Sequence, residues 1–489
     1  MNELSDIALI GLGVMGKNLA LNMEEHGARV LVYNRSFDKT QEFMNSEAKG
    51  KNFDAAKVLG EIAPLLKRPR RIVLMVKAGE PVDDLLKSLS VFLEPGDVII
   101  DAGNSNHIDS ERRVQFLEKK GLLYVATGVS GGEEGARKGP SIMPGGSAAA
   151  WPIVRDLFQA ISAKANDGTP CCDWIGSGGS GHFVKMVHNG IEYGDMQVIS
   201  EAYDIMRRLL MQSNTQAAEV FAQWDKGPMA SFLVEITADI LKRKEANGTD
   251  AVDNILDAAG QKGTGRWTVE NALAFGSPLT LVAEAVFARS LSAMKEERIV
   301  AAKIFDSPIT PKADNSTASI NSMLQDLEKA VFASKLVSYA QGFALMRDAS
   351  NAQNWNLDLG KIAMLWRGGC IIRSRFLEKI RDAFAQNKNL TNLMVDPYFA
   401  GVLRDVEPSW RRIVSHAVLA GVPVPALSSA LAYFDGYRSS TLPANLLQAQ
   451  RDHFGAHTYE RINEPRGKFF HSHWSTTTSN ESLTFEEVK

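Results

Sequence analysis

Hydrophobic positions in the first part of the chain follow two alternating patterns. Up to about residue 175, short β-branched runs alternate with stretches in which apolar residues recur every three or four positions. The runs that we expect to form strands are Ile7–Ile10, Val30–Tyr33, Ile72–Val76, Val98–Ile100 and Leu122–Ala126. Such alternation is typical of a parallel, doubly wound sheet covered by helices. The N-terminal part is therefore predicted to be an α/β domain.

The pattern changes after a cluster of glycines, and strand-like runs almost vanish beyond it. These glycines are Gly176, Gly178, Gly179 and Gly181. From His182 to about Tyr437 helical periodicity dominates, and the apolar positions from Phe183 to Leu210 predict one long, largely buried helix. We therefore expect an α/β domain at residues 1–178, a large all-α domain at 179–438 and a C-terminal tail at 439–489.

The C-terminal part contains an apolar stretch and then a polar tail. Residues 413–434 lack Asp, Glu, Lys and Arg, but Gly421, Pro423 and Pro425 interrupt them, which favours two short buried helices over a membrane span. After Asp435 the pattern loosens, and the tail is too polar to form a core of its own. We expect the tail to dock on another surface.

Composition narrows the class of protein. The 489 residues are 45% hydrophobic and 23% charged, as in ordinary globular proteins. Because 54 Lys and Arg stand against 57 Asp and Glu, no overall basic field exists to bind nucleic acid or an anionic membrane. The three cysteines, Cys171, Cys172 and Cys370, match neither a disulfide framework nor a metal-binding spacing. With no basic signal-peptide region at the N-terminus, we expect a cytoplasmic protein.

A glycine-rich loop follows the first predicted strand and precedes a helical stretch. Its residues are Gly11, Leu12, Gly13, Val14, Met15 and Gly16. This is the dinucleotide-binding fingerprint in its proper context, which predicts a Rossmann-type domain. The same loop resembles a phosphate-binding P-loop, but Asn18 stands where Ser or Thr would bind magnesium. A nucleotide triphosphatase is thus a lesser alternative.

The residues after the second predicted strand indicate which dinucleotide binds. Proteins that bind NAD carry Asp or Glu there, whereas this chain has Asn34, Arg35 and Ser36. A carboxylate would repel a 2′-phosphate, while a guanidinium binds it through charge-assisted hydrogen bonds. The predicted cofactor is NADP.

Four polar residues beyond the glycine cluster are spaced to share one helix face. They are Lys185, His188, Asn189 and Glu192, at i, i+3, i+4 and i+7. A lysine without its proton could accept the proton of a substrate hydroxyl as hydride leaves carbon. Gly190 and Gly194 would weaken this helix unless close packing or ligand access requires them. The histidine spacing does not indicate a metal site.

Several segments of the chain resemble the family of decarboxylating 6-phosphogluconate dehydrogenases, almost from end to end. The matching segments are 11–16 (GLGVMG), 130–136 (SGGEEGA), 185–193 (KMVHNGIEY), 261–265 (QKGTG), 366–370 (WRGGC) and 450–457 (QRDHFGAH). The resemblance implies an NADP-dependent oxidoreductase of the pentose phosphate pathway and gluconate utilization. Such an enzyme oxidises 6-phosphogluconate at C3, releases CO2 and yields ribulose 5-phosphate without a metal.

The resemblance also implies roles for individual residues. Lys185 would be the general base and then acid, and Glu192 would protonate C1, with His188 and Asn189 as further catalytic residues. Cofactor contacts would come from Gly11 to Gly16, Asn34, Arg35, Ser36, Val76, Lys77, Ala78 and Asn104. Substrate contacts would come from Asn104, Ser130, Gly131, Gly132, Lys185, His188, Asn189, Glu192, Tyr193, Lys262 and Arg289. In a homodimer, Arg451 and His457 would reach the site from the partner subunit.

Two other functions are consistent with parts of this pattern. A β-hydroxyacid dehydrogenase that does not decarboxylate would not need both Glu192 and the phosphate-binding residues Arg289, Arg451 and His457. A noncatalytic NADP-binding scaffold would keep Arg35 and the glycines but would not need Lys185.

Overall fold

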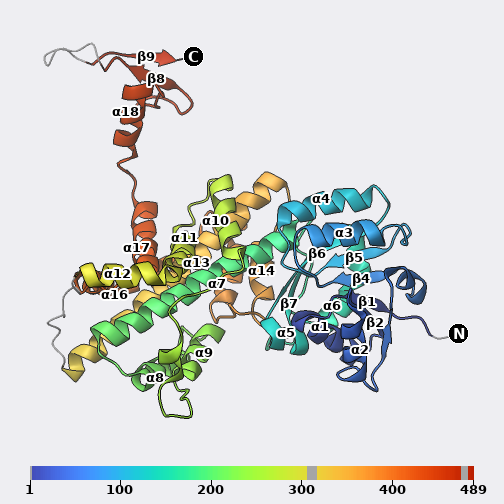
Figure 1. The fold of residues 1–489 in the computed structure, drawn as a ribbon. Helices are drawn as coiled ribbons and strands as arrows, with labels where there is room; N and C mark the ends of the chain where they lie inside the picture. The colour runs from blue at the N-terminus through green and yellow to red at the C-terminus, as the bar shows by residue number, and fades with distance from the viewer. Residues whose placement is uncertain (1–2, 306–315, 475–482, 489) are drawn as a thin grey trace. The chain divides into compact units, whose positions relative to one another are not determined.

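The computed structural model describes residues 3–305, 316–474 and 483–488. The chain forms two compact units, one of residues 1–431 and one of residues 432–489. The first unit contains a seven-stranded sheet and a large set of helices (Figure 1).

The sheet has the strand order β3-β2-β1-β4-β5-β6-β7. Its strands are β1 (Ile7–Ile10), β2 (Val30–Tyr33), β3 (Phe53–Ala55), β4 (Arg71–Leu74), β5 (Val98–Asp101), β6 (Leu123–Ser130) and β7 (Ser141–Gly146). Neighbours are parallel from β3 through β6, and β7 pairs with β6 in the antiparallel direction. The first six strands have the order typical of dinucleotide-binding domains. All five predicted strands are present, although β4 ends before Val76 and β6 continues to Ser130.

Two strands of this sheet were not predicted, and the predicted parallel arrangement is wrong at one edge. β3 has only three residues, too few for a clear periodic pattern. β7 contains Pro144, Gly145 and Gly146, which weaken the sequence pattern of a strand, yet all six of its residues are buried. Helix α7 packs against β7, which explains how such a strand becomes interior.

Helices cover both faces of the sheet (Figure 1). One face carries α1 (Val14–Glu25), α2 (Phe37–Asn45), α5 (Gly132–Lys138) and α6 (Trp151–Ile161), and the other carries α3 (Glu80–Leu89) and α4 (His107–Glu118). Successive strand residues enter opposite cores: Leu9 packs on the first face, whereas Ile10 packs on the second. Strands buried on both faces account for the continuous apolar runs in the sequence.

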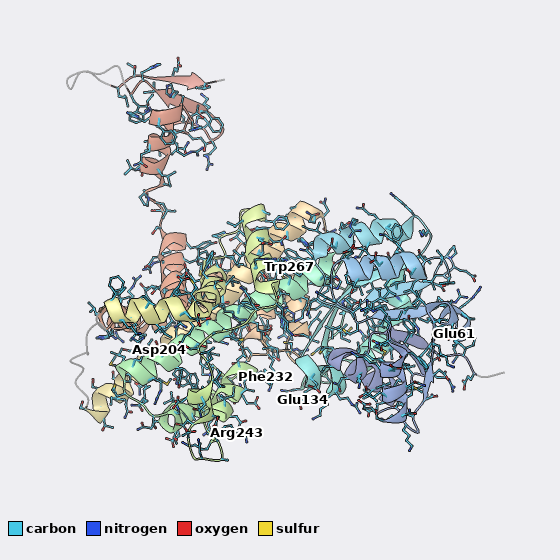
Figure 2. All side chains as sticks on the ribbon, in the orientation of Figure 1. Glu61, Glu134, Asp204, Phe232, Arg243 and Trp267 are labelled. Atoms are coloured by element: carbon cyan, nitrogen blue, oxygen red, sulfur yellow. The ribbon has the colours of Figure 1, made fainter. Side chains whose placement is uncertain are left out.

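The predicted long helix is α7 (Ser180–Asp204), and it continues as a π-helical turn through Leu209. It runs from the sheet into the helical part, where Asp204 marks its end in Figure 2. A Cβ atom on Gly190 would lie 2.6 Å from Thr268, and one on Gly194 would lie 2.6 Å from Ser338. Close packing therefore explains both glycines.

The other helices of this part follow α7 along the chain. They are α8 (Asn214–Trp224), α9 (Phe232–Ile240), α10 (Thr264–Phe275), α11 (Thr280–Ala293), α12 (Lys295–Ile304), α13 (Thr317–Gln353), α14 (Leu359–Leu365), α15 (Leu377–Gln386), α16 (Pro397–Leu419) and α17 (Pro425–Arg438). The apolar stretch at 413–434 is broken between α16 and α17 as predicted, but α16 has 23 residues and is not short. Within the described ranges, no helix combines the length and apolarity that a membrane crossing requires.

The C-terminal unit has more regular structure than its loose pattern indicated. It contains α18 (Ala444–Gly455) and the antiparallel pair β8 (Phe469–Ser472) and β9 (Phe485–Val488). The buried Asp452 carboxylate joins them, because it accepts hydrogen bonds from His471 (3.0 Å), Ser472 (3.0 Å) and Trp474 (2.8 Å). A polar side chain, rather than a large apolar core, holds this unit together.

Candidate active site

The four polar residues predicted to share a helix face lie on the first half of α7. Lys185 is 7% exposed, and its Nζ atom lies 2.6 Å from Asn189 Oδ1 and 3.4 Å from His188 Nδ1. His188 Nδ1 in turn lies 3.9 Å from Glu192 Oε2. We call Lys185, His188, Asn189 and Glu192 the α7 stripe. The structure brings its members together in a buried setting.

The sheet supplies a fifth polar group to this stripe. Ser130 ends β6, and its Oγ atom lies 3.2 Å from Lys185 Nζ and 3.3 Å from His188 Nε2. The Trp366 ring packs edge-on against His188, with 5.5 Å between ring centroids. The contact between β6 and the α7 stripe therefore places a hydroxyl, an imidazole and an amine around one point.

Burial alters the acid–base properties of the α7 stripe. Desolvation lowers the pKa of Lys185 from 10.5, although Glu192 opposes this change. Burial raises the pKa of Glu192 above 4.5, and burial beside Lys185 lowers the pKa of His188 well below 6.5. All three shifts favour neutral forms. The site therefore favours an amine that can accept a proton and a carboxyl group that can donate one.

Two predicted substrate residues lie just beyond the α7 stripe. The Arg289 guanidinium on α11 stacks over the Tyr193 ring, 3.5 Å from its centroid. A Cβ atom on Gly265 would lie 2.6 Å from that same ring, so the start of α10 also packs closely against Tyr193. Lys262 is exposed in the segment that precedes α10. The structure thus places Arg289 and Tyr193 together.

The loop between β1 and α1 fits the pyrophosphate of a dinucleotide. Side chains at Gly11 and Gly16 would collide with backbone atoms, at 2.3 Å from Met75 O and 1.9 Å from Gly11 O. At Gly13 no described atom lies within 4 Å of the Cβ position, and no described side chain caps the start of α1. Free backbone N–H groups at an open helix N-terminus bind phosphate well.

The residues after β2 and β4 lie at the same carboxyl edge of the sheet. Asn34 Oδ1 accepts the Leu12 N–H at 3.1 Å, which ties the loop after β2 to the glycine loop. Arg35 and Ser36 beside it are exposed, as are Lys77 and Asn104 farther along the edge. Val76 and Ala78 are half-buried, and Gly131 and Gly132 begin α5 next to Ser130. The structure places these residues on neighbouring loops, with room for a ligand-facing side chain at Arg35.

Two predicted substrate residues lie in the C-terminal unit. Arg451 is exposed on α18 and donates a hydrogen bond to Gln448 at 3.1 Å, and His457 is exposed just after α18. His182, in the first turn of α7, bonds instead to Ser110 (2.6 Å) and to the Asp101 carbonyl (3.1 Å). Among the described residues, no group of three or more His, Cys, Asp or Glu could hold a metal ion.

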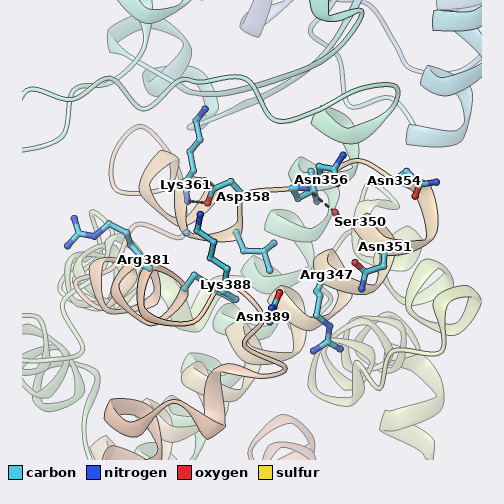
Figure 3. Close-up of a pocket in the computed structure, with 15 residues that line it drawn as sticks. Arg347, Ser350, Asn351, Asn354, Asn356, Asp358, Lys361, Arg381, Lys388 and Asn389 are labelled. Atoms are coloured by element: carbon cyan, nitrogen blue, oxygen red, sulfur yellow. Dashed lines mark hydrogen bonds between the residues drawn. The ribbon is translucent and has the colours of Figure 1, made fainter.

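A separate cleft of about 890 Å³ lies between α13, α14 and α15 (Figure 3). Its charged lining residues are Arg347, Asp358, Lys361, Arg381 and Lys388. Three of its cations have acidic partners: Arg347 binds Asp348, Lys361 binds Asp173 and Arg381 binds Asp382. None of its lining residues belongs to the predicted site.

Sequence spacing did not reveal the buried groups that support the carboxyl edge of the sheet. Asp101, at the end of β5, bonds to Arg113 of α4 and Tyr124 of β6. Asp101 is fully buried, and so is Arg113. No local pattern could have identified the group, because its members come from three separate elements.

A dinucleotide-binding sheet beside a buried lysine defines a nicotinamide-nucleotide-dependent dehydrogenase. Residues 6–176 match the NAD binding domain of 6-phosphogluconate dehydrogenase, and residues 181–474 match the C-terminal domain of 6-phosphogluconate dehydrogenase. The chain belongs to the 6-phosphogluconate dehydrogenase family.

Individual relatives are similar over nearly their whole length. The decarboxylating 6-phosphogluconate dehydrogenase of Rattus norvegicus is 52% identical over 471 residues, 96% of this chain and 97% of its own. That of Haemophilus influenzae is 51% identical over 488 residues and covers 100% of both chains. A solved structure of the Plasmodium falciparum enzyme has a TM-score of 0.91 at 44% identity, and covers 96% of this chain and 100% of that one. It was solved in its apo form, with its cofactor NADP+ and with its substrate 6-phosphogluconate.

Proposed function

We propose that this chain oxidises and decarboxylates 6-phospho-D-gluconate to D-ribulose 5-phosphate and CO2, with reduction of NADP+ to NADPH. The observation that carries the proposal is the buried Lys185 amine, held by neutral partners at the carboxyl end of β6 in a sheet of the dinucleotide-binding type. The full-length similarity to decarboxylating 6-phosphogluconate dehydrogenases supports the same reaction.

Lys185 is the general base and then the general acid of the reaction. Because burial lowers its pKa, the amine loses its proton more easily than a free lysine does. It accepts the proton of the C3 hydroxyl, and the chemistry supplied by bound NADP+ is acceptance of the hydride from C3. The resulting Lys185 ammonium polarises the new C3 carbonyl, which accepts the electron pair released as CO2 leaves.

Glu192 completes the reaction by protonating C1 of the enediol. Burial raises the pKa of its carboxyl group, so a larger fraction carries the proton that this step needs. His188 and Asn189 hold the Lys185 amine from the same helix, and Ser130 holds it from β6. The group can therefore donate and accept protons without a metal.

Substrate binding uses cations for the phosphate and carboxylate and hydroxyl or amide groups for the sugar chain. Arg289, stacked on Tyr193, presents a planar donor set suited to a phosphate. The remaining contacts proposed are Asn104, Ser130, Gly131, Gly132, His188, Asn189 and Lys262. Gly11 to Gly16, Asn34, Ser36, Val76, Lys77 and Ala78 hold the dinucleotide, and Arg35 binds its 2′-phosphate.

A homodimer would complete the site with Arg451 and His457 of the partner's tail. Exposed apolar side chains gather on α11 and α12, and include Phe287, Leu291, Ile299, Val300 and Ile304. Surfaces of this kind are typical of subunit interfaces. The proposal also includes domain boundaries at residues 178 and 438 and a cytoplasmic location for the protein. It places the reaction in the pentose phosphate pathway and gluconate utilization.

Mixed dimers test the tail's role. Lys185→Met and Arg451→Ala subunits, each inactive alone, are co-expressed with different tags and the mixed dimer is purified. If the tail serves the partner's site, one intact site forms and about half of the wild-type activity returns. If it serves its own subunit, the mixed dimer stays inactive.

The central assay follows NADPH absorbance with 6-phosphogluconate while CO2 is trapped. One CO2 per NADPH is expected; NADPH without CO2 would indicate a dehydrogenase that does not decarboxylate, and no NADPH would indicate a binding scaffold.

Arg35→Asp should weaken NADP+ binding by about tenfold or more while NAD+ binding changes little. Equal losses would contradict the assignment of Arg35 to the 2′-phosphate.

A further inference from the structure

A buried carboxylate lies at the carboxyl end of β5, directly beneath the edge where the proposed ligands bind. Asp101 is fully buried. Its Oδ1 atom accepts the Gly103 N–H at 3.1 Å, and its Oδ2 atom accepts the hydroxyls of Ser105 and Tyr124, each at 2.7 Å. Arg113 Nη1 lies 3.3 Å from the same Oδ2. The carboxylate therefore joins β5, β6 and α4.

Arg113 extends this contact to the neighbouring loop. Its guanidinium, also fully buried, donates to Ser105 Oγ at 3.2 Å and to the Gly79 carbonyl at 2.9 Å. Asp83 at the start of α3 accepts two further hydrogen bonds, at 2.9 and 3.2 Å. One side chain thus holds the loop after β4 and the loop after β5 together.

These two loops carry residues proposed to contact the cofactor and the substrate. Asn104 lies between Gly103 and Ser105, and polar groups of both neighbours bond to Asp101. Gly79 directly follows Val76, Lys77 and Ala78. The loops touch, because a Cβ atom on Gly103 would lie 3.2 Å from the Val76 carbonyl.

The same group also touches the start of α7. The Asp101 carbonyl lies 3.1 Å from His182 Nε2, three residues before Lys185. Buried ion pairs add little stability relative to apolar packing, so stability alone does not account for one at this place. Fixed, directional hydrogen bonds do position the groups attached to them.

We infer that Asp101 and Arg113 are positioning residues, which hold the loops of Val76–Ala78 and Asn104 in register with each other. This inference rests on the proposed function, since it assigns those loops to NADP+ and 6-phosphogluconate. Neither Asp101 nor Arg113 needs to touch a ligand.

The other end of the same strand provides a matched control. Asp97, immediately before β5, accepts hydrogen bonds from Arg70 N and Arg70 Nη1, both at 2.8 Å, and both side chains are buried. This pair lies at the amino edge of the sheet, away from the proposed ligands. Asp97→Asn therefore measures the loss of a buried ion pair without any change at the ligand-binding edge.

The test compares Asp101→Asn with Asp97→Asn in the full chain. NADP+ binding is measured by calorimetry, KM by turnover of 6-phosphogluconate, and folding by urea denaturation. Both variants should lose stability. Only Asp101→Asn should raise the NADP+ dissociation constant or the KM for 6-phosphogluconate, by about tenfold. Equal effects of the two substitutions, or no change in either constant, would overturn the inference.

Milder variants keep the test decisive if Asp101→Asn does not fold. Ser105→Ala removes one hydroxyl bonded to both Asp101 and Arg113 and should shift the same constants in the same direction. Arg113→Lys should recover part of the NADP+ binding lost in Arg113→Met. Unchanged constants in Ser105→Ala, together with no recovery of NADP+ binding in Arg113→Lys, would also overturn the inference. A wild-type chain that binds NADP+ without turnover would refute the proposed function. The comparison of NADP+ binding between Asp101→Asn and Asp97→Asn would still decide the inference about Asp101 and Arg113.

Discussion

One buried lysine belongs to α7 and another contacts it from α13, and the two differ in the group that each amine faces. Lys185, on the first half of the helix, has its Nζ atom 2.6 Å from the neutral Asn189 amide oxygen. Lys335, on α13, has its Nζ atom 2.5 Å from a carboxylate oxygen of Asp195, on the second half. Lys335 is 0% exposed and Lys185 is 7% exposed, so burial alone does not distinguish them.

The group that faces each buried amine determines whether the amine releases its proton or forms an ion pair. Amide and hydroxyl partners cannot offset the loss of hydration, so burial lowers the pKa of Lys185 and frees its proton. The carboxylate facing Lys335 forms an ion pair that joins α7 to α13. The two glutamates of α7 also differ in their partners: Glu192 interacts with Lys185 at the proposed site, whereas Glu201 accepts hydrogen bonds from backbone N–H groups of α17. In the proposed function, the first half of α7 serves chemistry and the second half serves structure.

The largest expected effect is that of Lys185→Met, which should abolish formation of NADPH from 6-phosphogluconate. Met fills a similar volume but cannot accept a proton, so NADP+ binding and folding should change little. Turnover and NADP+ calorimetry measure the two effects. Lys185→Arg is a useful companion, because it keeps the charge but cannot release the proton. Parallel loss of turnover and NADP+ binding in Lys185→Met would make Lys185 structural and remove the contrast with Lys335.

Glu192→Gln should lower kcat by about 10²- to 10⁴-fold, the usual contribution of a general acid. Gln keeps the shape of the side chain but has no acidic proton for C1. Steady-state kinetics should show this loss with little change in NADP+ binding. If kcat stays within a few-fold of wild type, Glu192 is not the proton donor.

Lys335→Met should act on stability, because it leaves Asp195 buried and unpaired. The expected loss is about 3–5 kcal/mol in the free energy of unfolding, as measured by urea denaturation. Enzyme that remains folded should turn over at nearly the wild-type rate. The double variant Lys335→Met with Asp195→Leu should regain most of the stability, since neither charge remains. Loss of turnover in folded Lys335→Met would show that the second half of α7 also takes part in chemistry.

The sequence predicts those parts of the fold whose pattern is local. β1 and β2 coincide with their predicted runs, and α7 extends close to the predicted Leu210, because apolar spacing determines both kinds of element. β7 was missed because its Pro144 and paired glycines resemble a turn, and only the packing of α7 makes it interior. Tertiary contacts determined this strand.

The same limit applies to the candidate site. The α7 stripe follows from helical spacing alone, and the structure confirms that its four residues lie together. Ser130 lies 55 residues from Lys185 in the chain, and Asp195 lies 140 from Lys335, so spacing could not show either contact. The resemblance to a family supplied Ser130. Nothing local indicated that Lys335 is an ion-paired residue of the core.

Glu201 supplies the smallest effect and tests the structural half of α7 by pH. Its carboxylate accepts the N–H groups of Ala426 and Leu427, at 2.8 and 2.9 Å. Burial, opposed by these hydrogen bonds and aided by the nearby Glu284, raises its pKa from 4.5 to about 7. In the folded chain Glu201 therefore keeps its proton to a higher pH than in the unfolded chain.

The direction of the pH effect follows from this difference. The stability that the proton contributes is complete below pH 4.5 and is lost as the pH rises through about 7, a change of about 3 kcal/mol. Glu201→Gln has no proton to release, so urea denaturation across this range should show its stability rising relative to wild type as the pH rises. Glu219→Gln removes an exposed carboxyl group of α8 and serves as the control for loss of an acidic side chain at the surface. A constant difference between Glu201→Gln and wild type would mean that the α17 N–H groups keep Glu201 ionised across this range.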